Sequence, residues 1–274
     1  MAKMNTRRKL AIATWRSPRE GNIYGKIELD ATNAQAYINY HRKVSGKRVT
    51  ITHLIGKAIA KALKQAPTLN GRIVFGRFIP HKTVDVTFLV SLEGGSDLAK
   101  AKIIDADKKS TVQISEELQE KSIKLHRGQD QEFEKAKGVL RILPTWILRP
   151  IIWVTGFLSG GLGLKVKSLG LEPFPFGSCI ITSLGMFGID EGFAPPTPFA
   201  RVPLYVLVGS IRDIPAVVNG QIVVRPYITL SATIDHRFID GHQLTVLSSI
   251  IKNSIDNPWL LDGLEGPPAD FSFS

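Results

Sequence analysis

Apolar and polar residues follow two different periods along the first half of the chain. Residues 22–30 alternate, as in a strand with one covered face. In residues 50–66 the apolar positions recur at helical spacing, and a proline follows, which predicts a helix. Residues 83–92 are apolar and β-branched, which favours a short buried strand. Residues 110–125 are typical of a second helix, capped by the hydroxyl residue at position 110 or 111.

The last third of the chain is patterned mainly as sheet. Residues 203–210 form a nearly continuous apolar run, as in a strand that is covered on both faces. The pair Asn219-Gly220 predicts a hairpin turn. Every second residue of 224–234 is apolar, so this strand should carry His236 to its far end. Apolar positions in 244–255 then predict a closing helix, and we expect one α/β domain in all.

Residues 139–164 form an unusual amphipathic segment. Their predicted apolar stripe comprises Val139, Leu143, Trp146, Ile147, Ile151, Val154 and Leu158. The longest uncharged stretch, residues 150–164, is short for a bilayer span. Two interpretations remain beside a transmembrane helix: a helix lying on a membrane surface, and a helix packed on this protein or on a partner subunit.

Composition excludes several classes of function. The formal net charge of +11 suits an anionic partner, but the basic residues are scattered and no nucleic-acid motif accompanies them. The single cysteine, Cys179, excludes an internal disulfide and is expected to pack as a small hydrophobe. No spaced Cys/His set predicts a metal site. Residues 10–13 are too short for a secretory segment, so we expect a cytoplasmic protein, with membrane association through 139–164 as the open alternative.

Two short patches carry residues that are capable of chemistry. In the first, His236 could act as a base, Asp240 could fix the local geometry, and Gly241 could let the chain turn away. In the second, Thr182 and Ser183 end a predicted strand, where hydroxyls can donate hydrogen bonds to a developing oxyanion. On their own, these hydroxyls could equally satisfy the backbone groups of a turn.

Together the two patches carry a family resemblance. Residues 181–188, followed by residues 235–241, resemble the catalytic core of the dihydrolipoamide acyltransferases of 2-oxo-acid dehydrogenase complexes, which share a fold with chloramphenicol acetyltransferase. Residues 206–211, 217–220 and 224–226 agree with the same pattern. The resemblance is specific in residues 177–260 and fails in about 130–175.

The resemblance implies a fold, an assembly and a mechanism. The fold would be a chloramphenicol acetyltransferase-like mixed sheet flanked by helices, forming a homotrimer with each active site between two subunits. Coenzyme A, or acyl-CoA, would be the substrate. His236 would be the general base for a thiol or hydroxyl acceptor, and Thr182, in place of the family's serine, would hydrogen-bond the tetrahedral oxyanion. Ser183 would support the site.

Asp240 has two interpretations within this family. It is either a second catalytic group or an anchor that forms an ion pair and holds the histidine loop. For the anchor role, Arg19 or Arg16 is the candidate partner, because residues 15–20 resemble an early Trp-Arg-rich segment of the related acetyltransferases. Gly241 would be required by the backbone.

The differences between this chain and the family bear on the identity of the acyl acceptor more than on the type of reaction. We expect residues 1–274 to form a single catalytic domain with an amphipathic insertion at about 130–175, without a lipoyl or a peripheral subunit-binding domain. Such a chain would hold no covalently attached lipoate and no metal. Its acceptor would be a separate lipoyl protein or another small molecule. The alternative function is a non-catalytic trimeric scaffold or a membrane-docking homologue.

Overall fold

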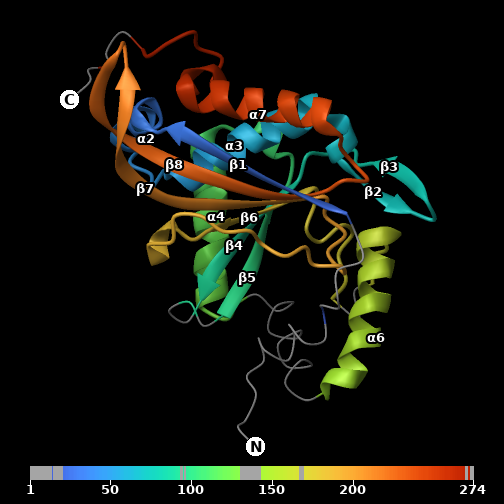
Figure 1. The fold of residues 1–274 in the computed structure, drawn as a ribbon. Helices are drawn as coiled ribbons and strands as arrows, with labels where there is room; N and C mark the ends of the chain where they lie inside the picture. Colours follow the sequence, from blue (N-terminus) through green and yellow to red (C-terminus); the bar gives the residue numbers. More distant parts are fainter. Residues whose placement is uncertain are drawn as a thin grey trace, which may run out of the picture.

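A six-stranded mixed sheet forms the centre of the molecule (Figure 1). The structure is a computed structural model that describes residues 14, 21–92, 95, 97–129, 143–166, 170–268 and 271. The strand order is β1-β8-β7-β6-β4-β5. The strands of this sheet are β1 (Asn22–Asp30), β4 (Val86–Leu92), β5 (Asp97–Ile103), β6 (Cys179–Ser183), β7 (Leu204–Val218) and β8 (Gln221–Asp235).

The sheet combines both strand directions, as the family resemblance implies. Strand β6 pairs parallel with both β4 and β7, while β1 with β8, β7 with β8, and β4 with β5 are antiparallel. A parallel pair needs a long connection, and the chain between β4 and β6 supplies one that includes β5, α4 and α6. The expected mixed sheet flanked by helices is therefore confirmed.

One face of the sheet is covered by a layer of helices (Figure 1). The main core lies between this layer and side chains such as Leu204, Val206 and Val208 of β7, which are at most 3% exposed. Alternation along the strand turns Tyr205 to the other face, where a smaller cluster includes Ile180. The helices that connect these strands or follow the last of them are α2 (Thr32–Ser45), α3 (Ile51–Gln65), α4 (Thr111–His126) and α7 (Gly241–Asp256).

The predicted local elements agree with the observed ones at most boundaries. Strand β1 has the bounds that its alternation predicts, and α3 begins after Thr50. Helix α4 is capped by Ser110, whose side chain accepts a hydrogen bond from the backbone N–H of Gln113. The hairpin turn is confirmed, because Asn219 and Gly220 have φ values of 51° and 80°, which a tight hairpin turn requires.

Strand β8 differs from an ordinary half-covered strand, because its polar face is buried as well. Thr229, Ser231 and Thr233 are each at most 2% exposed. The hydroxyls of Ser231 and Thr233 have no hydrogen-bond partner among the described residues. Both faces of the central sheet are therefore covered near the end of β8, where His236 follows.

The amphipathic segment forms a helix at one side of the molecule, away from the main helical layer (Figure 1). This helix, α6 (Thr145–Gly156), continues into a π-helical turn, η4 (Phe157–Gly161), which contacts the two-stranded hairpin of β2 (Gly71–Val74) and β3 (Arg77–Pro80).

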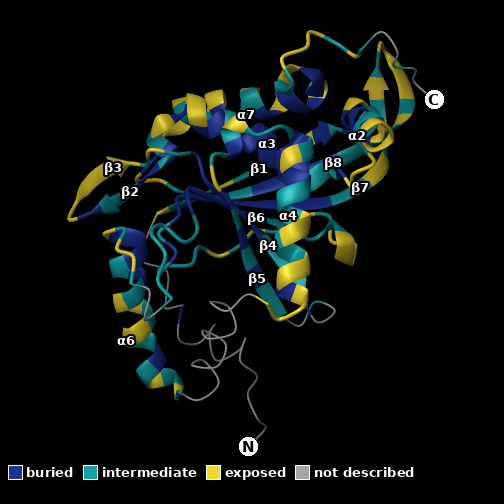
Figure 2. Ribbon diagram, turned by 180° about the vertical axis from the view of Figure 1, so that it is seen from behind, coloured by how far each residue is buried: buried dark blue, intermediate teal, exposed yellow. Residues whose placement is uncertain are grey.

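The apolar stripe predicted for this segment is not the face that packs on the rest of the chain. Trp146 is 77% exposed and Val154 is 57% exposed, whereas Leu148, outside the stripe, is 1% exposed. Figure 2 shows exposed, intermediate and buried residues along α6. The sequence shows which residues share a helix face, but it does not show which face meets the protein. Val139 lies outside the described residues.

No helix in the described ranges is both long enough and apolar enough to cross a bilayer.

His53 is a buried histidine that takes part in helix capping. It is the third residue of α3 and 9% exposed, and its Nδ1 accepts a hydrogen bond of 3.1 Å from the backbone N–H of Thr50. Burial, together with the charges of Arg48 and Arg42, lowers the pKa of His53 to about 4. The folded protein therefore keeps this imidazole neutral at a pH where the unfolded chain protonates it.

We expect the His53→Gln variant to be less sensitive to acid than the wild type. Glutamine can supply the acceptor at this capping position without titrating. Because the folded pKa of His53 is depressed, its contribution to stability is present above pH 6.5 and is lost as the pH falls toward 4. Urea unfolding at pH 7 and pH 5 should show that the variant loses about 2 kcal/mol less than the wild type. Equal losses would contradict a neutral buried His53.

Candidate active site at the end of strand β8

His236 lies in a tight turn directly after β8, and its ring is held by the backbone. Its Nδ1 lies 2.8 Å from the carbonyl oxygen of Ile239, and its backbone N–H donates to the carbonyl oxygen of Gly21 at 3.0 Å. A carbonyl oxygen can only accept, so Nδ1 carries the ring proton in the neutral histidine. The lone pair is then on Nε2, on an exposed side chain. This tautomer and orientation allow Nε2 to accept a proton from an approaching group.

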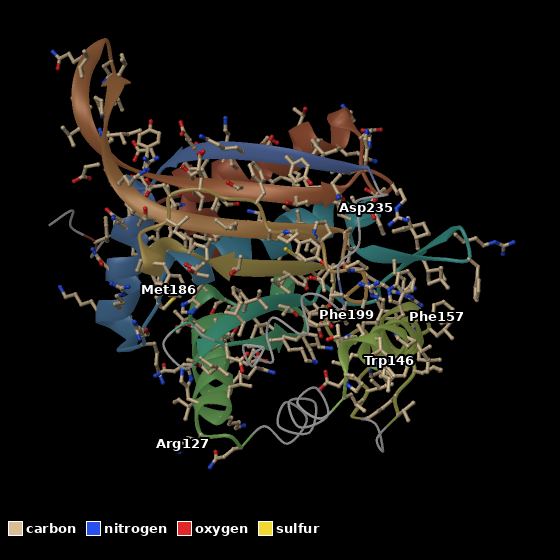
Figure 3. All side chains as sticks on the ribbon, turned by 60° about the horizontal axis from the view of Figure 1, so that its bottom comes forward. Arg127, Trp146, Phe157, Met186, Phe199 and Asp235 are labelled. Atoms are coloured by element: carbon tan, nitrogen blue, oxygen red, sulfur yellow. The ribbon has the colours of Figure 1, made fainter. Side chains whose placement is uncertain are left out.

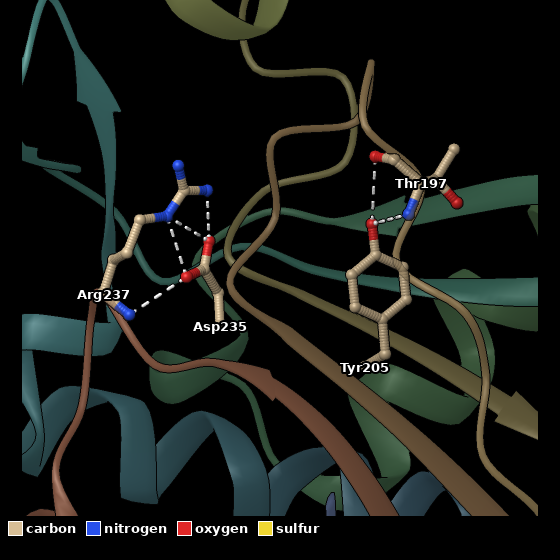
Figure 4. Close-up of polar contacts among 4 residues, drawn as sticks. All are labelled: Thr197, Tyr205, Asp235 and Arg237. Carbon is tan, nitrogen blue, oxygen red and sulfur yellow. Dashed lines mark hydrogen bonds and ion pairs between the residues drawn. The ribbon is translucent and has the colours of Figure 1, made fainter. Parts of the chain in front are cut away.

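An ion pair spans the histidine. The guanidinium Nε of Arg237 donates to both carboxylate oxygens of Asp235, at 2.9 and 3.0 Å, and the backbone N–H of Arg237 donates to the same carboxylate (Figure 4). The Asp235 side chain is 12% exposed, so the carboxylate is well shielded. The pair clamps the residues on either side of His236 and so restricts the conformations open to the turn.

Asp240, four residues after His236, begins helix α7. Its carboxylate accepts the backbone N–H of Gln243 at 3.1 Å, and the Gln243 side chain accepts the backbone N–H of Asp240 at 3.1 Å. This reciprocal capping box gives Asp240 a structural task at the end of the histidine turn. The candidate partners Arg16 and Arg19 lie outside the described residues, so their pairing with Asp240 stays a prediction.

Gly241 has no evident backbone reason to be glycine within the single chain. Its φ does not lie in the left-handed region, and a Cβ at this position would meet nothing within 4 Å. By contrast, Gly209 in β7 cannot carry a side chain, because a Cβ there would lie 1.8 Å from the carbonyl oxygen of Asp190. The expected requirement for glycine at position 241 is thus not seen in the described part of one chain.

Thr182 and Ser183 end strand β6, and their side chains point to opposite faces of the sheet. Thr182 pairs with Leu207 in the register, on the face away from the main helical layer, while Ser183 pairs with Val208 of the main core. Both residues are half-buried, and neither hydroxyl has a hydrogen-bond partner among the described residues. Thr182 therefore presents a free donor on the outer face.

One chain does not bring Thr182 and His236 together. Thr182 aligns through Leu207 with Ser231 of β8, and His236 comes five residues later. At about 3.3 Å per residue, that offset is roughly 16 Å along the strands, and two strand spacings add to it. In Figure 3, Met186, which follows the Thr182 segment, lies well away from Asp235, which precedes the histidine.

A cavity of about 240 Å³ lies beside the histidine turn. Its walls include Asp235, Arg237 and Phe238 from that turn, and Trp153 from α6. Tyr205 also lines it, and its hydroxyl binds the backbone of Thr197, which holds the 196–203 segment in place (Figure 4). Local sequence patterns do not indicate this cavity, because its walls come from segments far apart in the chain.

Cys179 and His242 also have side chains that are capable of chemistry. Cys179 is 0% exposed in the core, and burial raises the pKa of its thiol, so the expectation that it packs as a small hydrophobe is confirmed. His242 is exposed on the first turn of α7. Within the described residues, no group of three or more His, Cys, Asp or Glu side chains could hold a metal ion.

Comparison with known proteins places the chain in a family. The model of the 2-oxoacid dehydrogenases acyltransferase (catalytic domain) family matches residues 8–142 and 164–262. The interruption at 143–163 contains α6 and η4 and lies within the range of about 130–175 that the sequence predicts as an insertion.

Several relatives and solved structures are similar over most of the chain. The dihydrolipoyllysine-residue succinyltransferase component of the 2-oxoglutarate dehydrogenase complex of Escherichia coli K12 is 25% identical over 241 residues, which is 87% of this chain and 47% of that protein. The corresponding protein of Buchnera aphidicola is 24% identical over 81% of this chain and 45% of its own length. The chain thus spans about half the length of these relatives.

The fold agrees with the sequence comparison. A probable dihydrolipoamide acetyltransferase from Listeria monocytogenes has a TM-score of 0.68 at 22% identity, covering 93% of this chain and 94% of that chain. The truncated catalytic core of the 2-oxoacid dehydrogenase complex from Thermoplasma acidophilum has a TM-score of 0.64 at 22% identity, covering 94% and 98%. With the family match on both sides of α6, these findings show that the chain belongs to the 2-oxoacid dehydrogenase acyltransferase (catalytic domain) family.

Proposed function

We propose that this chain is a CoA-dependent acyltransferase. It moves an acyl group between coenzyme A and a thiol such as dihydrolipoamide, or another small acceptor, with His236 as the general base and Thr182 as the oxyanion donor. The observation that carries the proposal is the hydrogen bond from His236 Nδ1 to the Ile239 carbonyl oxygen, which leaves Nε2 as the proton acceptor. Family membership supports the reaction type.

The reaction needs only proton transfer and nucleophilic attack. Nε2 of His236 takes the acceptor's thiol proton, and the thiolate forms a bond to the carbonyl carbon of the acyl-CoA thioester. The Thr182 hydroxyl donates to the oxyanion of the tetrahedral intermediate. As the intermediate collapses, the bond to the CoA sulfur breaks and the imidazolium returns its proton to that sulfur. The clamp between Asp235 and Arg237 keeps the turn in place throughout.

Related structures support the choice of residues. A structure of the Azotobacter vinelandii dihydrolipoamide acetyltransferase addresses the roles of a serine, a histidine and an asparagine in its catalytic mechanism. In that protein the asparagine follows the histidine by four residues, as Asp240 follows His236 here. The serine precedes the histidine by about 50 residues, as Thr182 precedes His236. Asp240 in this chain combines that position with the cap of α7.

The separation of Thr182 from His236 supports an active site shared between subunits. In a closed ring of identical chains, each chain contacts the next through the same two surfaces. His236 on one surface can then lie beside Thr182 on the surface of the neighbouring chain. Similar structures include the cubic core of the pyruvate dehydrogenase multienzyme complex, with a TM-score of 0.64. We infer that this chain forms a homotrimer. The relatives' names point to a lipoyl thiol as acceptor, which a separate lipoyl protein would carry.

Replacing His236 by alanine should strongly reduce turnover while leaving the fold intact. We expect the release of free CoA thiol from acyl-CoA, with dihydrolipoamide as acceptor, to fall by a factor on the order of 10² to 10⁴, because the base is lost. His242→Ala is the matched control, since it removes an exposed histidine six residues away. Undiminished turnover in His236→Ala would refute the assignment, and a wild type inactive with every donor and acceptor would favour the non-catalytic scaffold.

A mixture of two inactive variants tests the shared site. Thr182→Val keeps the side-chain shape and removes the donor, so its turnover should fall by a factor on the order of 10² to 10³. Co-expression of Thr182→Val with His236→Ala should restore about a quarter of the wild-type turnover, because each mixed trimer then holds one intact site. Failure of the mixture to recover activity, with mixed trimers confirmed by mass spectrometry, would place both residues in one chain's site or remove Thr182 from it.

A second candidate function, contact with an anionic membrane surface, has one observation in its favour. Helix α6 exposes Trp146 and Val154, and no acidic residue occurs between Glu134 and Glu172. Aromatic and apolar side chains on a helix that lacks acidic residues suit the interface of a membrane with negatively charged lipids.

Vesicle binding distinguishes this membrane contact from non-specific adhesion. We expect wild-type protein to co-sediment with vesicles that contain phosphatidylserine, and the Trp146→Asp/Val154→Asp variant to bind several-fold less. The control variant Val217→Asp/Ile222→Asp changes equally exposed apolar residues near the β7–β8 turn and should bind as the wild type does. Equal binding by both variants, or none by the wild type, would rule out docking through α6.

A further inference from the structure

The β2–β3 hairpin has a phenylalanine at a turn position that this residue type disfavours. Phe75 and Gly76 form the two-residue turn between the strands, with φ values of 50° and 72°. Such a turn favours asparagine followed by glycine, because a bulky side chain is strained at positive φ. The β7–β8 turn of the same chain has the favoured pair, Asn219 and Gly220, at φ values of 51° and 80°. Turn geometry therefore does not explain Phe75.

Packing within the chain does not explain this phenylalanine either. Phe75 is 82% exposed, and the ring contact that it makes among the described residues is an edge-to-face meeting with Phe157 at 5.7 Å. A strained residue persists where its surroundings or its function require it, and an exposed aromatic ring leaves apolar surface in water. The tip of the hairpin thus presents a ring to something outside the chain.

The base of the hairpin holds this tip in place. Phe78 packs over Gly71, where a Cβ would lie 2.5 Å from its ring, and it meets Phe238 of the histidine turn edge to face at 6.1 Å. Nε of Arg72 donates to the carbonyl oxygen of Gly161 at 2.7 Å, which ties β2 to the π-helical turn after α6. The hairpin and the end of α6 therefore share one surface, and Figures 1 and 2 show both on the same side of the molecule.

The solvent-facing side of α6 continues this surface. Trp146, Trp153 and Val154 are all exposed, and their spacing of seven and eight residues places them on one side of the helix. Figure 1 shows the hairpin projecting from the molecule next to this helix. The exposed apolar side chains thus lie on a helix flank and on a projecting tip, and not in a groove. Such a surface suits insertion into a soft, flat interface.

The charge of the two segments indicates which interface they fit. The sequence has no aspartate or glutamate in residues 31–84, which contain the hairpin, and none in residues 135–171, which contain α6. Exposed basic residues in these ranges include Arg77 next to the tip and Lys165 after the π-helical turn. Basic charge beside exposed apolar rings matches a bilayer surface with negatively charged lipid headgroups.

We propose that the β2–β3 hairpin is a second membrane-docking element, which inserts Phe75 among anionic lipid headgroups beside α6. This inference rests on the membrane contact proposed for α6 and adds a separate point of attachment. Two attached elements fix the orientation of the chain on a bilayer, which one helix alone does not. Because the base of the hairpin packs on the histidine turn, docking places that turn close to the lipid surface.

The first test is Phe75→Asn, because it removes the ring and improves the turn. Asparagine suits the positive φ of position 75, so the melting temperature should equal or exceed that of the wild type. Binding to vesicles of equal parts phosphatidylcholine and phosphatidylserine should weaken about tenfold, because the interface no longer buries an aromatic side chain. Ile222→Asn changes a residue that is 79% exposed near the β7–β8 turn, and should bind as the wild type does.

A fluorescent label locates the tip directly. Cys179 is buried, so in Phe75→Cys an environment-sensitive thiol dye reacts mainly at position 75. We expect the dye emission to shift to the blue on the mixed vesicles and to stay unchanged with phosphatidylcholine alone. The same dye on Ile222→Cys should show no shift with either vesicle. An equal shift of the Phe75→Cys dye on both kinds of vesicle would overturn the requirement for anionic lipid.

The outcomes distinguish the hairpin from α6. If the wild type binds vesicles while Phe75→Asn binds equally well and the dye at position 75 does not shift, the hairpin proposal is overturned and the contact through α6 stands. If Phe75→Asn loses binding while Trp146→Asp/Val154→Asp keeps it, the hairpin stands and the contact through α6 fails. A wild type that binds no vesicles overturns both. If, in that case, Phe75→Asn also changes the oligomeric state, the tip belongs to a contact between copies of this chain.

Discussion

The antiparallel pairing of β7 with β8 is the constraint on which the rest of the site depends. Leu204 aligns with Ile234, so β8 ends beside the start of β7, and the chain turns into His236 at that end of the sheet. Strand β6 runs parallel to β7 and therefore delivers Thr182 toward the other end. A slip of one residue would turn every core side chain of β8 to the opposite face, and the burial of both faces prevents it.

The sequence predicts the local elements well, because each rests on a nearby signal. Strand β1 alternates over nine residues, Asn219 and Gly220 adopt the positive φ values that their residue types favour, and Ser110 caps α4. The histidine turn was likewise marked by its own residues. What the residues alone did not reveal is the carbonyl partner at Ile239, because turn geometry determines which backbone oxygen faces the ring.

The features that the sequence does not predict depend on contacts between distant segments. Ser231 and Thr233 occupy positions that alternate with apolar residues, which is typical of a solvated face, but segments outside β8 bury them. The sequence predicts an apolar stripe on α6, yet Trp146 in this stripe is exposed and Leu148 outside it is covered. The cavity that includes Trp153 is assembled from several parts of the chain, and no periodicity within one part carries that information.

The burial of Cys179 affects how acyl transfer from coenzyme A can be followed. Thiol-reactive dyes attack thiolates, and the thiol of this single cysteine is 0% exposed with a raised pKa. The folded protein therefore adds no rapidly reacting sulfur of its own to the colour that coenzyme A would produce if the proposed acyl transfer liberates it. A slow increase in dye reaction without any donor would instead report exposure of the core around β6, so the same reagent measures both catalysis and unfolding.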